Sequence, residues 1–315
     1  MATVPGGIFD SPDVSADEGA LISDFLNSLG IGETALSQVT VEPVGSTVIS
    51  DSTPTVVTSL AEGTTASIVL SGSTAKTIVL TGTGSANLDA STSTASVNVQ
   101  GGAGGDSLIG GLASDQVTGG LGDDIVYGGA GDDTVAGGLG NDVIDGGVGN
   151  DVLVSNPGSD TFSGGDGADT LSAGQANDLL YGNIGNDVIY GNQQNDVIYG
   201  GQGDDVIYGG QNEDSIFGNR GDDTMFGNLG DDVFVLQDNS GSDVINGFVQ
   251  GTDLLQIQQN INGLSISSPA DLLTRVSSDA NGNAVIDLGN GNQVTLVGIT
   301  AAEVSGDIDN MIDII

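Results

Sequence analysis

Residues 200–208 read Gly-Gly-Gln-Gly-Asp-Asp-Val-Ile-Tyr, and this nine-residue pattern decides the fold of the chain. Written as G-G-x-G-x-D-x-U-x, with U apolar, the pattern recurs without insertion fifteen times over residues 101–235. Position 2 is always Gly or Asn, which tolerate left-handed backbone angles, so a turn with positive φ is expected in every repeat. Position 8 is always apolar and has β-forming neighbours. We therefore predict a short strand in each repeat, with position 8 facing inward and positions 7 and 9 outward.

Position 6 is Asp in all fifteen repeats. A turn Asp commonly bonds nearby backbone, but Asn or Ser would serve equally well there, so its invariance indicates that negative charge is needed. Stacked carboxylates repel one another unless a cation lies between them. Oxygen donors without His or Cys select a hard ion, and calcium accepts six to eight oxygens in flexible geometry. The candidate calcium ligands are Asp106, Asp115, Asp124, Asp133, Asp142, Asp151, Asp160, Asp169, Asp178, Asp187, Asp196, Asp205, Asp214, Asp223 and Asp232.

The pattern resembles the calcium-binding nonapeptide repeats of the RTX (repeats-in-toxin) family, and the resemblance extends from Gly101 to the C-terminus. It implies an all-β, right-handed parallel β-roll in which the first six residues of a repeat form a turn and the last three a strand. It also implies that calcium lies between turns two repeats apart, held by position-6 Asp carboxylates and backbone carbonyls. Fifteen turns then give about 13 pairs, each closing one site. Filling them would bring the formal charge of −40 to about −14.

Some repeats depart from Gly at position 4 or position 1, and we expect weaker or reshaped calcium sites near them. The residues at these places are Ala113, Ala176, Gln194 and Asn212 at position 4, and Ser155 and Ala173 at position 1.

The repeats are flanked by segments of different composition, which predicts four regions. Residues 1–36 form an N-terminal arm, in which Ser15–Leu29 has the apolar stripe of an amphipathic helix. Residues 37–100 are a Ser/Thr-rich β segment that leads into the solenoid, and its β-rich stretches Val39–Ile49 and Thr55–Leu60 are expected to pair with a neighbouring copy. Residues 101–235 are the roll.

Residues 236–315 are expected to form a β-rich C-terminal cap. Ala284–Leu288 and Gln293–Val297 flank a Gly-Asn-Gly-Asn turn, which is a strong hairpin signal. The acidic and apolar C-terminal tail resembles an uncleaved type I secretion signal of RTX proteins. The first residues lack the basic and apolar regions of a signal peptide, and no apolar run reaches the ~18 residues of a membrane span. We therefore expect an extracellular or cell-surface protein, exported without an N-terminal signal peptide.

The composition excludes several functions. Only Lys76, Arg220 and Arg275 could meet phosphates, which excludes nucleic acid as a partner. Without His there is neither a zinc protease motif nor a Ser-His-Asp triad, and no G-x-S-x-G elbow occurs. A carboxylate-pair glycosidase is compatible with the residue types, so an RTX-type carbohydrate-active enzyme stays an alternative. The Ser/Thr-rich residues before the repeats are few for a catalytic domain, and we predict that the chain is not an enzyme.

Outward aromatic residues occupy position 9 in six successive repeats. Because repeats alternate between sheets, we predict two ladders, which serve either to stabilise each sheet or to contact a partner. They are Tyr181, Tyr199 and Phe217, and Tyr190, Tyr208 and Phe226. The sequence thus favours a calcium-binding structural protein that forms homo-oligomers or polymers, as a surface-layer, sheath or filament subunit. A calcium-dependent adhesin that binds cell-surface polysaccharide is the alternative.

Overall fold

The computed structural model describes residues 46–49, 55–60 and 62–315. The chain divides into two compact units, Met1–Thr161 and Phe162–Ile315. The helix expected at Ser15–Leu29 lies outside the described residues.

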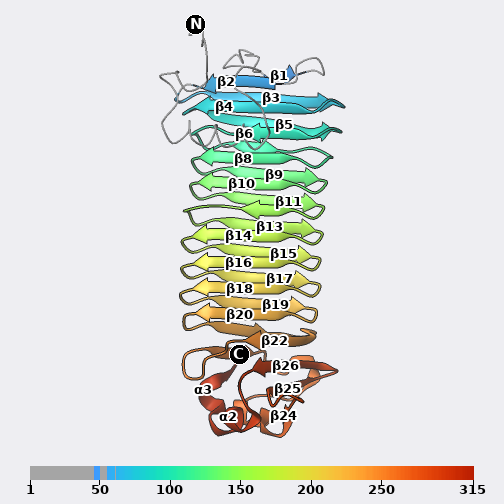
Figure 1. Cartoon of the computed structure of the whole chain (residues 1–315), viewed down its shortest axis with the longest axis vertical. Helices are drawn as coiled ribbons and strands as arrows, with labels where there is room; N and C mark the ends of the chain where they lie inside the picture. The colour runs from blue at the N-terminus through green and yellow to red at the C-terminus, as the bar shows by residue number, and fades with distance from the viewer. Residues whose placement is uncertain (1–45, 50–54, 61) are drawn as a thin grey trace. The chain divides into compact units, whose positions relative to one another are not determined.

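In the first unit, successive strands alternate between two parallel sheets (Figure 1). One sheet has the order β1-β3-β5-β7-β9-β11 and the other β2-β4-β6-β8-β10-β12. All pairings within them are parallel. The strands are β1 (Ser46–Ile49), β2 (Thr55–Leu60), β3 (Thr65–Gly72), β4 (Lys76–Gly82), β5 (Ser85–Ser93), β6 (Val97–Gln100), β7 (Ser107–Ile109), β8 (Gln116–Leu121), β9 (Ile125–Ala130), β10 (Thr134–Leu139), β11 (Val143–Val148) and β12 (Val152–Val154).

In the second unit successive strands also alternate between two sheets, and the unit ends in a cap. Its sheets have the orders β13-β15-β17-β19-β21-β23-β27 and β14-β16-β18-β20-β22-β26-β25-β24. The elements are β13 (Thr161–Asp166), β14 (Thr170–Gln175), β15 (Leu179–Ile184), β16 (Val188–Gln193), β17 (Val197–Gln202), β18 (Val206–Gln211), β19 (Ser215–Arg220), β20 (Thr224–Leu229), β21 (Val233–Leu236), β22 (Ser242–Asn246), β23 (Leu254–Ile257), the 3-10 helices η3 (Ile261–Gly263) and η4 (Pro269–Arg275), β24 (Val276–Ser278), β25 (Ala284–Gly289), β26 (Asn292–Val297), α2 (Ala301–Gly306), α3 (Ile308–Met311) and β27 (Ile312–Ile314).

The core is the column of position-8 side chains between the two sheets of each unit. All fifteen, from Leu108 to Phe234, are completely buried, while positions 7 and 9 are half-buried or exposed except for the buried Val235 of the last repeat. Each such side chain removes a large apolar area from water, worth about 1.5–3 kcal/mol for a Leu, Ile or Phe. The all-β class, the parallel β-roll and the inward direction of position 8 are confirmed.

The strands are longer than the expected three residues. A typical strand, β17, begins at position 7 with Val197 and ends at position 3 of the next repeat with Gln202. The Gly-rich positions 1 to 3 therefore belong to the strand, because Asn183 and Ile184 pair with Gly201 and Gln202 in a continuous parallel ladder. Only positions 4 to 6 form the turn, so the six-residue turn expected from the family resemblance is wrong.

Position 2 has positive φ in most repeats but not in all. Asn192 and Gly201 have φ of 80° and 120°. Gly102, Gly111 and Asn156 do not have positive φ, and the strands before the last two, β7 and β12, are only three residues long. At Asn156 the cause is local, since the following Pro157 restricts the backbone of the residue before it. The expectation of a positive φ in every repeat is therefore wrong for these three turns.

The Ser/Thr-rich segment forms the first strands of the same sheets. β1 pairs with β3, and β2 pairs with β4 through six residue pairs. The expectation that these stretches pair with a neighbouring copy is therefore wrong for their described residues, which pair within this chain. Ile68 and Ile78, in β3 and β4, are completely buried and add to the core.

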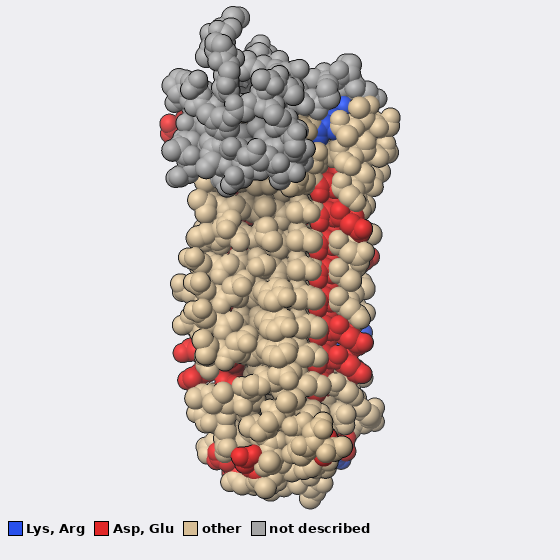
Figure 2. Space-filling model, viewed as in Figure 1, with Lys and Arg blue, Asp and Glu red and all other residues tan. Residues whose placement is uncertain are grey.

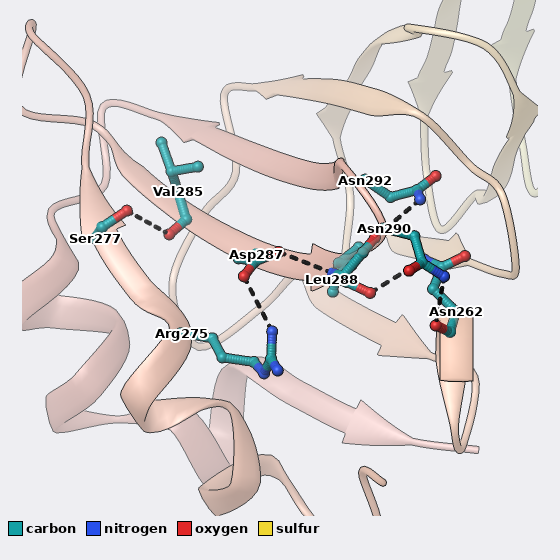
Figure 3. A network of polar contacts seen from close by, with 9 residues as sticks. Asn262, Arg275, Ser277, Val285, Asp287, Leu288, Asn290 and Asn292 are labelled. Carbon is teal, nitrogen blue, oxygen red and sulfur yellow. Dashed lines mark hydrogen bonds and ion pairs between the residues drawn. The ribbon is translucent and has the colours of Figure 1, made fainter. Parts of the chain in front are cut away.

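The C-terminal cap is built on the predicted hairpin. β25 and β26 pair antiparallel, and β26 also pairs in parallel with β22, so the hairpin extends one sheet of the roll. Figure 3 shows the polar network at its turn, where Asn292 donates to the Gly289 carbonyl and Asn290 donates to the Asn262 carbonyl. Arg275 forms an ion pair with Asp287 at 3.0 Å. At the end of the other sheet β27 pairs with β23.

No helix among the described residues is long and apolar enough to cross a membrane.

Candidate calcium sites

The position-6 aspartates form hydrogen-bonded ladders along the edges of the stacked strands. Within each unit, the backbone N–H of one Asp donates to Oδ1 of the Asp two repeats further on, at 2.7–3.0 Å. All fifteen side chains are buried, and none is more than 5% exposed. The structure therefore brings together the candidates that lie eighteen residues apart, as expected for turns that stack two repeats apart. Figure 2 shows acidic residues gathered in a line beside the sheet face.

The second oxygen of these carboxylates faces a different environment. Oδ2 has no hydrogen-bond partner in a series of fully buried aspartates: Asp124, Asp133, Asp187, Asp196, Asp205, Asp214, Asp223 and Asp232. An unsatisfied buried carboxylate oxygen is costly, by several kcal/mol if charged. A cation between the turns would remove that cost, so these orphaned oxygens fit a calcium ligand set.

The glycine at position 1 leaves room for this carboxylate. A Cβ atom on Gly200 would lie against Oδ2 of Asp205 in its own repeat and against the carbonyl oxygen of Gly218 two repeats on, at 2.7 Å from the latter. A side chain would therefore fill the space beside the orphaned oxygen. Ser155, one of the two exceptions, places its hydroxyl 3.4 Å from Oδ2 of Asp142.

Burial and neighbouring charge make these carboxylates hard to ionise without a cation. Burial, followed by repulsion from Asp106 and Asp142, raises the pKa of Asp124 to about 9. Burial and the adjacent Asp223 and Asp187 carboxylates raise the pKa of Asp205 to about 8. Among the described residues no three acidic or His side chains converge, so a site with enough ligands must also use backbone carbonyls.

Two of the candidates differ from the rest. Oδ2 of Asp106 accepts the N–H of Gly102 at 3.0 Å, and Oδ2 of Asp115 accepts the N–H of Gly111. These are the two Gly residues at position 2 that lack positive φ. The orientation of the peptide at position 2 thus decides whether Oδ2 accepts a hydrogen bond from its own turn. The sequence gives no signal for this difference, because turns of both kinds have Gly at position 2.

The ladders continue past the last nonapeptide through two residues that the repeat count missed. The N–H of Asp223 donates to Oδ1 of Asp243 at 3.2 Å, and the N–H of Asp232 donates to Oδ1 of Asp253 at 3.1 Å. The spacings are 20 and 21 residues instead of 18, which breaks the nine-residue register. An Asp followed by a β-branched or leucine pair, as in Asp243-Val244-Ile245, was the available signal.

Both predicted aromatic ladders are present. Tyr190 and Tyr208 stack with ring centroids 5.0 Å apart and an interplanar angle of 4°, and Phe226 follows Tyr208 at 4.7 Å. On the other sheet Tyr199 stacks between Tyr181 and Phe217 at 5.0 and 4.5 Å. Because the ring faces cover one another, each ladder presents ring edges to solvent.

The fold and these sites define a parallel β-roll with edge columns of buried carboxylates suited to a hard cation. The family model of the RTX calcium-binding nonapeptide repeat matches this chain repeatedly from residue 100 to residue 234. These residues are therefore RTX calcium-binding repeats, and the resemblance seen in the sequence is confirmed over this range.

Other comparisons add little. A search of the curated proteins finds no match. Among solved structures, the crystal structure of the extracellular lipase LipA from Serratia marcescens is similar at 18% identity and a TM-score of 0.31. The alignment covers 71% of this chain and 44% of the lipase chain, so less than half of that protein is matched. A likeness at this level supports no argument about function.

Proposed function

We propose that this chain is a secreted structural protein whose roll folds on external calcium and which then associates with copies of itself. The observation that carries the proposal is the column of buried carboxylate oxygens without partners. At neutral pH these groups oppose folding, because burial and mutual repulsion raise their pKa. Bound calcium would pair with the ionised carboxylates, so that their burial stabilises the fold instead of opposing it. Ion binding and folding would then be one equilibrium.

The proposed ligands are the fifteen position-6 aspartates, taken in pairs two repeats apart, with about one ion per pair. Two carboxylates supply at most four oxygens, and backbone carbonyls supply the rest. The rows of carbonyls are present: a Cβ on Gly201 would meet the Asn183 carbonyl, and a Cβ on Gly203 would meet the Gly185 carbonyl. Asp106 and Asp115 would have to release their own-turn N–H bonds to bind an ion, so we expect their sites to be the weakest.

Calcium-timed folding suits export to the extracellular medium or cell surface, and RTX repeats are typical of secreted proteins. The C-terminal tail supports this order of events. Met311 and Ile312 are buried, and β27 pairs with β23. A secretion signal in this tail is therefore accessible only before the cap folds. Low calcium inside the cell would keep the chain unfolded until it has passed through the channel.

Self-association is proposed from the distribution of charge. In a chain of net charge −40, strands β16, β18 and β20 contain no charged residue and carry one aromatic ladder. An uncharged sheet face with half-exposed Val and Tyr is suited to another copy of the same face, while the acidic edges stay in solvent or bind ions.

Analytical ultracentrifugation in millimolar calcium tests the assembly. The variant Tyr190→Ser with Tyr208→Ser should reduce polymer formation, while the control Tyr127→Ser, outside the ladders, should not. Circular dichroism of each variant checks that the roll is intact. A wild-type chain that stays monomeric at high concentration would remove the structural role.

A monomer would favour the second candidate, a calcium-dependent adhesin. A shallow groove beside the same ladder is lined by Tyr190, Asn192, Tyr208 and Asn228, among others, and offers both aromatic edges and amides to a polysaccharide. Binding of cell-surface glycans by monomers would support that reading, and hydrolysis of a polysaccharide would support the carbohydrate-active enzyme that the residue types allow.

A further inference from the structure

A second ladder of hydrogen bonds follows the turns at position 5, the residue before each buried aspartate. Most repeats have Asn or Asp at this position, and these side chains are exposed. In this outer ladder, Oδ1 accepts the backbone N–H of the corresponding residue in the turn that stacks next, at 2.8–3.3 Å. The donors and acceptors are Asn141 and Asp123, Asn150 and Asp132, Ser159 and Asn141, Asn195 and Asn177, Asp204 and Asn186, Asp222 and Asp204, and Ser242 and Asp222.

The outer ladder and the ladder of buried aspartates run in opposite directions along the chain. The Asp187 N–H donates forward, to Oδ1 of Asp205 in the turn that follows, at 2.9 Å. The Asp204 N–H donates backward, to Oδ1 of Asn186 in the turn that precedes it, also at 2.9 Å. Because a trans peptide is planar, its carbonyl points away from its N–H. The carbonyl of position 4 therefore points forward, and the carbonyl of position 5 points backward.

Close approaches between stacked glycines agree with these two directions. A Cβ atom on Gly221 would collide with the Gly203 carbonyl oxygen, so this position-4 carbonyl faces the turn that follows it. A Cβ atom on Gly105 would lie 2.8 Å from the Asp123 carbonyl oxygen, so this position-5 carbonyl faces the turn before it. The gap between two stacked turns thus receives carbonyl oxygens from both sides. Carboxylate oxygens without partners, such as Oδ2 of Asp205, lie in the same columns.

The outer ladder depends on an oxygen and not on charge. An Asn accepts the Asp204 N–H and an Asp accepts the Asp222 N–H, both at 2.9 Å. Position 6, in contrast, is Asp in all fifteen repeats. The longer Glu213 does not replace them, since its Oε2 meets Nδ2 of Asn195 at 3.4 Å and, within the described residues, accepts no bond from the Asp231 N–H. A short side chain with an acceptor oxygen is therefore what position 5 requires.

We propose that Asn and Asp at position 5 are positioning residues for calcium. By holding the N–H of a peptide in the next turn, the side chain aims the carbonyl of that same peptide at the ion beyond it. For Asn186 this peptide joins Gly203 to Asp204, and the ion lies between Asp205 and Asp223. The inference rests on the calcium ligands proposed above and adds a residue that acts on the ion through a backbone carbonyl, as an outer-shell partner orients a ligand.

Position 5 then ranks the calcium sites along the roll, although position 6 is the same in every repeat. Ala168 has a methyl group where the acceptor would be. The peptide between Gly185 and Asn186 therefore lacks this hold on its orientation, and its carbonyl is free to turn. The ion site that this carbonyl faces, between Asp187 and Asp205, should be weaker than the site that follows it along the same edge.

The test titrates the full chain with calcium alone and counts bound ions by native mass spectrometry. Asn186→Ala should need at least about tenfold more calcium to bind its last ion. Asn186→Asp keeps the acceptor oxygen and should restore the wild-type titration. Asn195→Ala is the matched control, because Asn195 is equally exposed at the same position but, within the described residues, its Oδ1 accepts no hydrogen bond. Ala168→Asn should lower the calcium concentration needed for one weak ion several-fold.

Urea unfolding of the calcium-saturated chains separates positioning from simple stacking. If Asn186→Ala lowers the urea midpoint but leaves the ion titration unchanged, the bond only holds the turns together and the inference is wrong. It is also wrong if Asn195→Ala weakens calcium binding as much as Asn186→Ala does. If the wild-type chain itself binds no calcium, the proposed function fails as well, so the two failures are distinguishable.

Discussion

Replacing Asp205 by Asn separates the structural role of this side chain from its role as a charge. Asn keeps an oxygen that can accept the Asp187 N–H, now accepted by Oδ1 at 2.9 Å, but it cannot ionise. At pH 7 the unfolded carboxyl, with a pKa of 3.8, is ionised, whereas burial raises the folded pKa to about 8 and keeps the proton on. Protonating this carboxyl at pH 7, about three pH units above its unfolded pKa, costs on the order of 4 kcal/mol. Without calcium, the free energy of unfolding is lower by that amount.

The Asp205→Asn variant should therefore change stability in opposite directions under two conditions. In chelator the folded state should gain up to about 4 kcal/mol relative to wild type, since the ionisation cost is gone. In calcium it should lose stability, since a ligand oxygen is gone. Urea unfolding followed by circular dichroism measures the loss in calcium, and the amount of a stabilising osmolyte needed to restore the β-roll signal in chelator measures the gain without calcium.

The control is Asp204→Asn, the same charge change at the exposed neighbouring residue, whose Oδ1 accepts the Asp222 N–H at 2.9 Å. It should show little difference between the two conditions. If Asp205→Asn destabilises the roll equally in chelator and in calcium, the carboxylate acts only as a hydrogen-bond acceptor and the charge argument is refuted.

Three further predictions follow from particular residues. In chelator, β-roll content should rise on acidification, because burial raises the folded pKa of Asp142, Asp205 and Asp124 to about 6, 8 and 9, so protonation favours the folded state. The stability should fall progressively as the pH rises from the unfolded pKa of 3.8 towards these folded values. Circular dichroism against pH checks this, and a roll that melts on acidification contradicts it. Gln194 has φ of 73°, so Gln194→Gly should stabilise the calcium-loaded roll by about 1 kcal/mol in urea unfolding, while Gln193→Gly, within β16, should destabilise it. Deleting residues 256–315 should abolish export in a secretion assay, and normal secretion of the truncated chain would exclude a signal in this tail.

The repeat pattern was sufficient to predict most of the roll. A strict period of nine with an apolar position 8 determines which side chains are inside, and alternation between sheets determines which pairs stack, as Tyr190 and Tyr208 do. These features depend only on register, which the sequence states without ambiguity. The fifteen buried aspartates are stacked as predicted, and their role as ligands stays a prediction.

What could not be predicted depends on peptide orientation and on breaks in register. Gly102 and Gly201 occupy the same position with the same residue type, but only Gly201 has positive φ. Asp243 and Asp253 continue the ladders after insertions that shift the count by two and three residues. The sequence also did not predict the strand partners of β1 and β2. Both strands pair within the sheets of this chain, but their Ser/Thr-rich sequences lack the nine-residue period that would have indicated it.

The most direct test is a calcium titration in which native mass spectrometry counts the ions and circular dichroism follows folding in the same samples. At neutral pH and low salt, the chain in chelator should lack the β-roll signal, because buried carboxylates such as Asp196, with a pKa of about 8, oppose folding. Millimolar calcium should restore the signal cooperatively, with about a dozen ions bound per chain. A fully folded roll in chelator with no ion bound would contradict the claim that calcium and folding are one equilibrium.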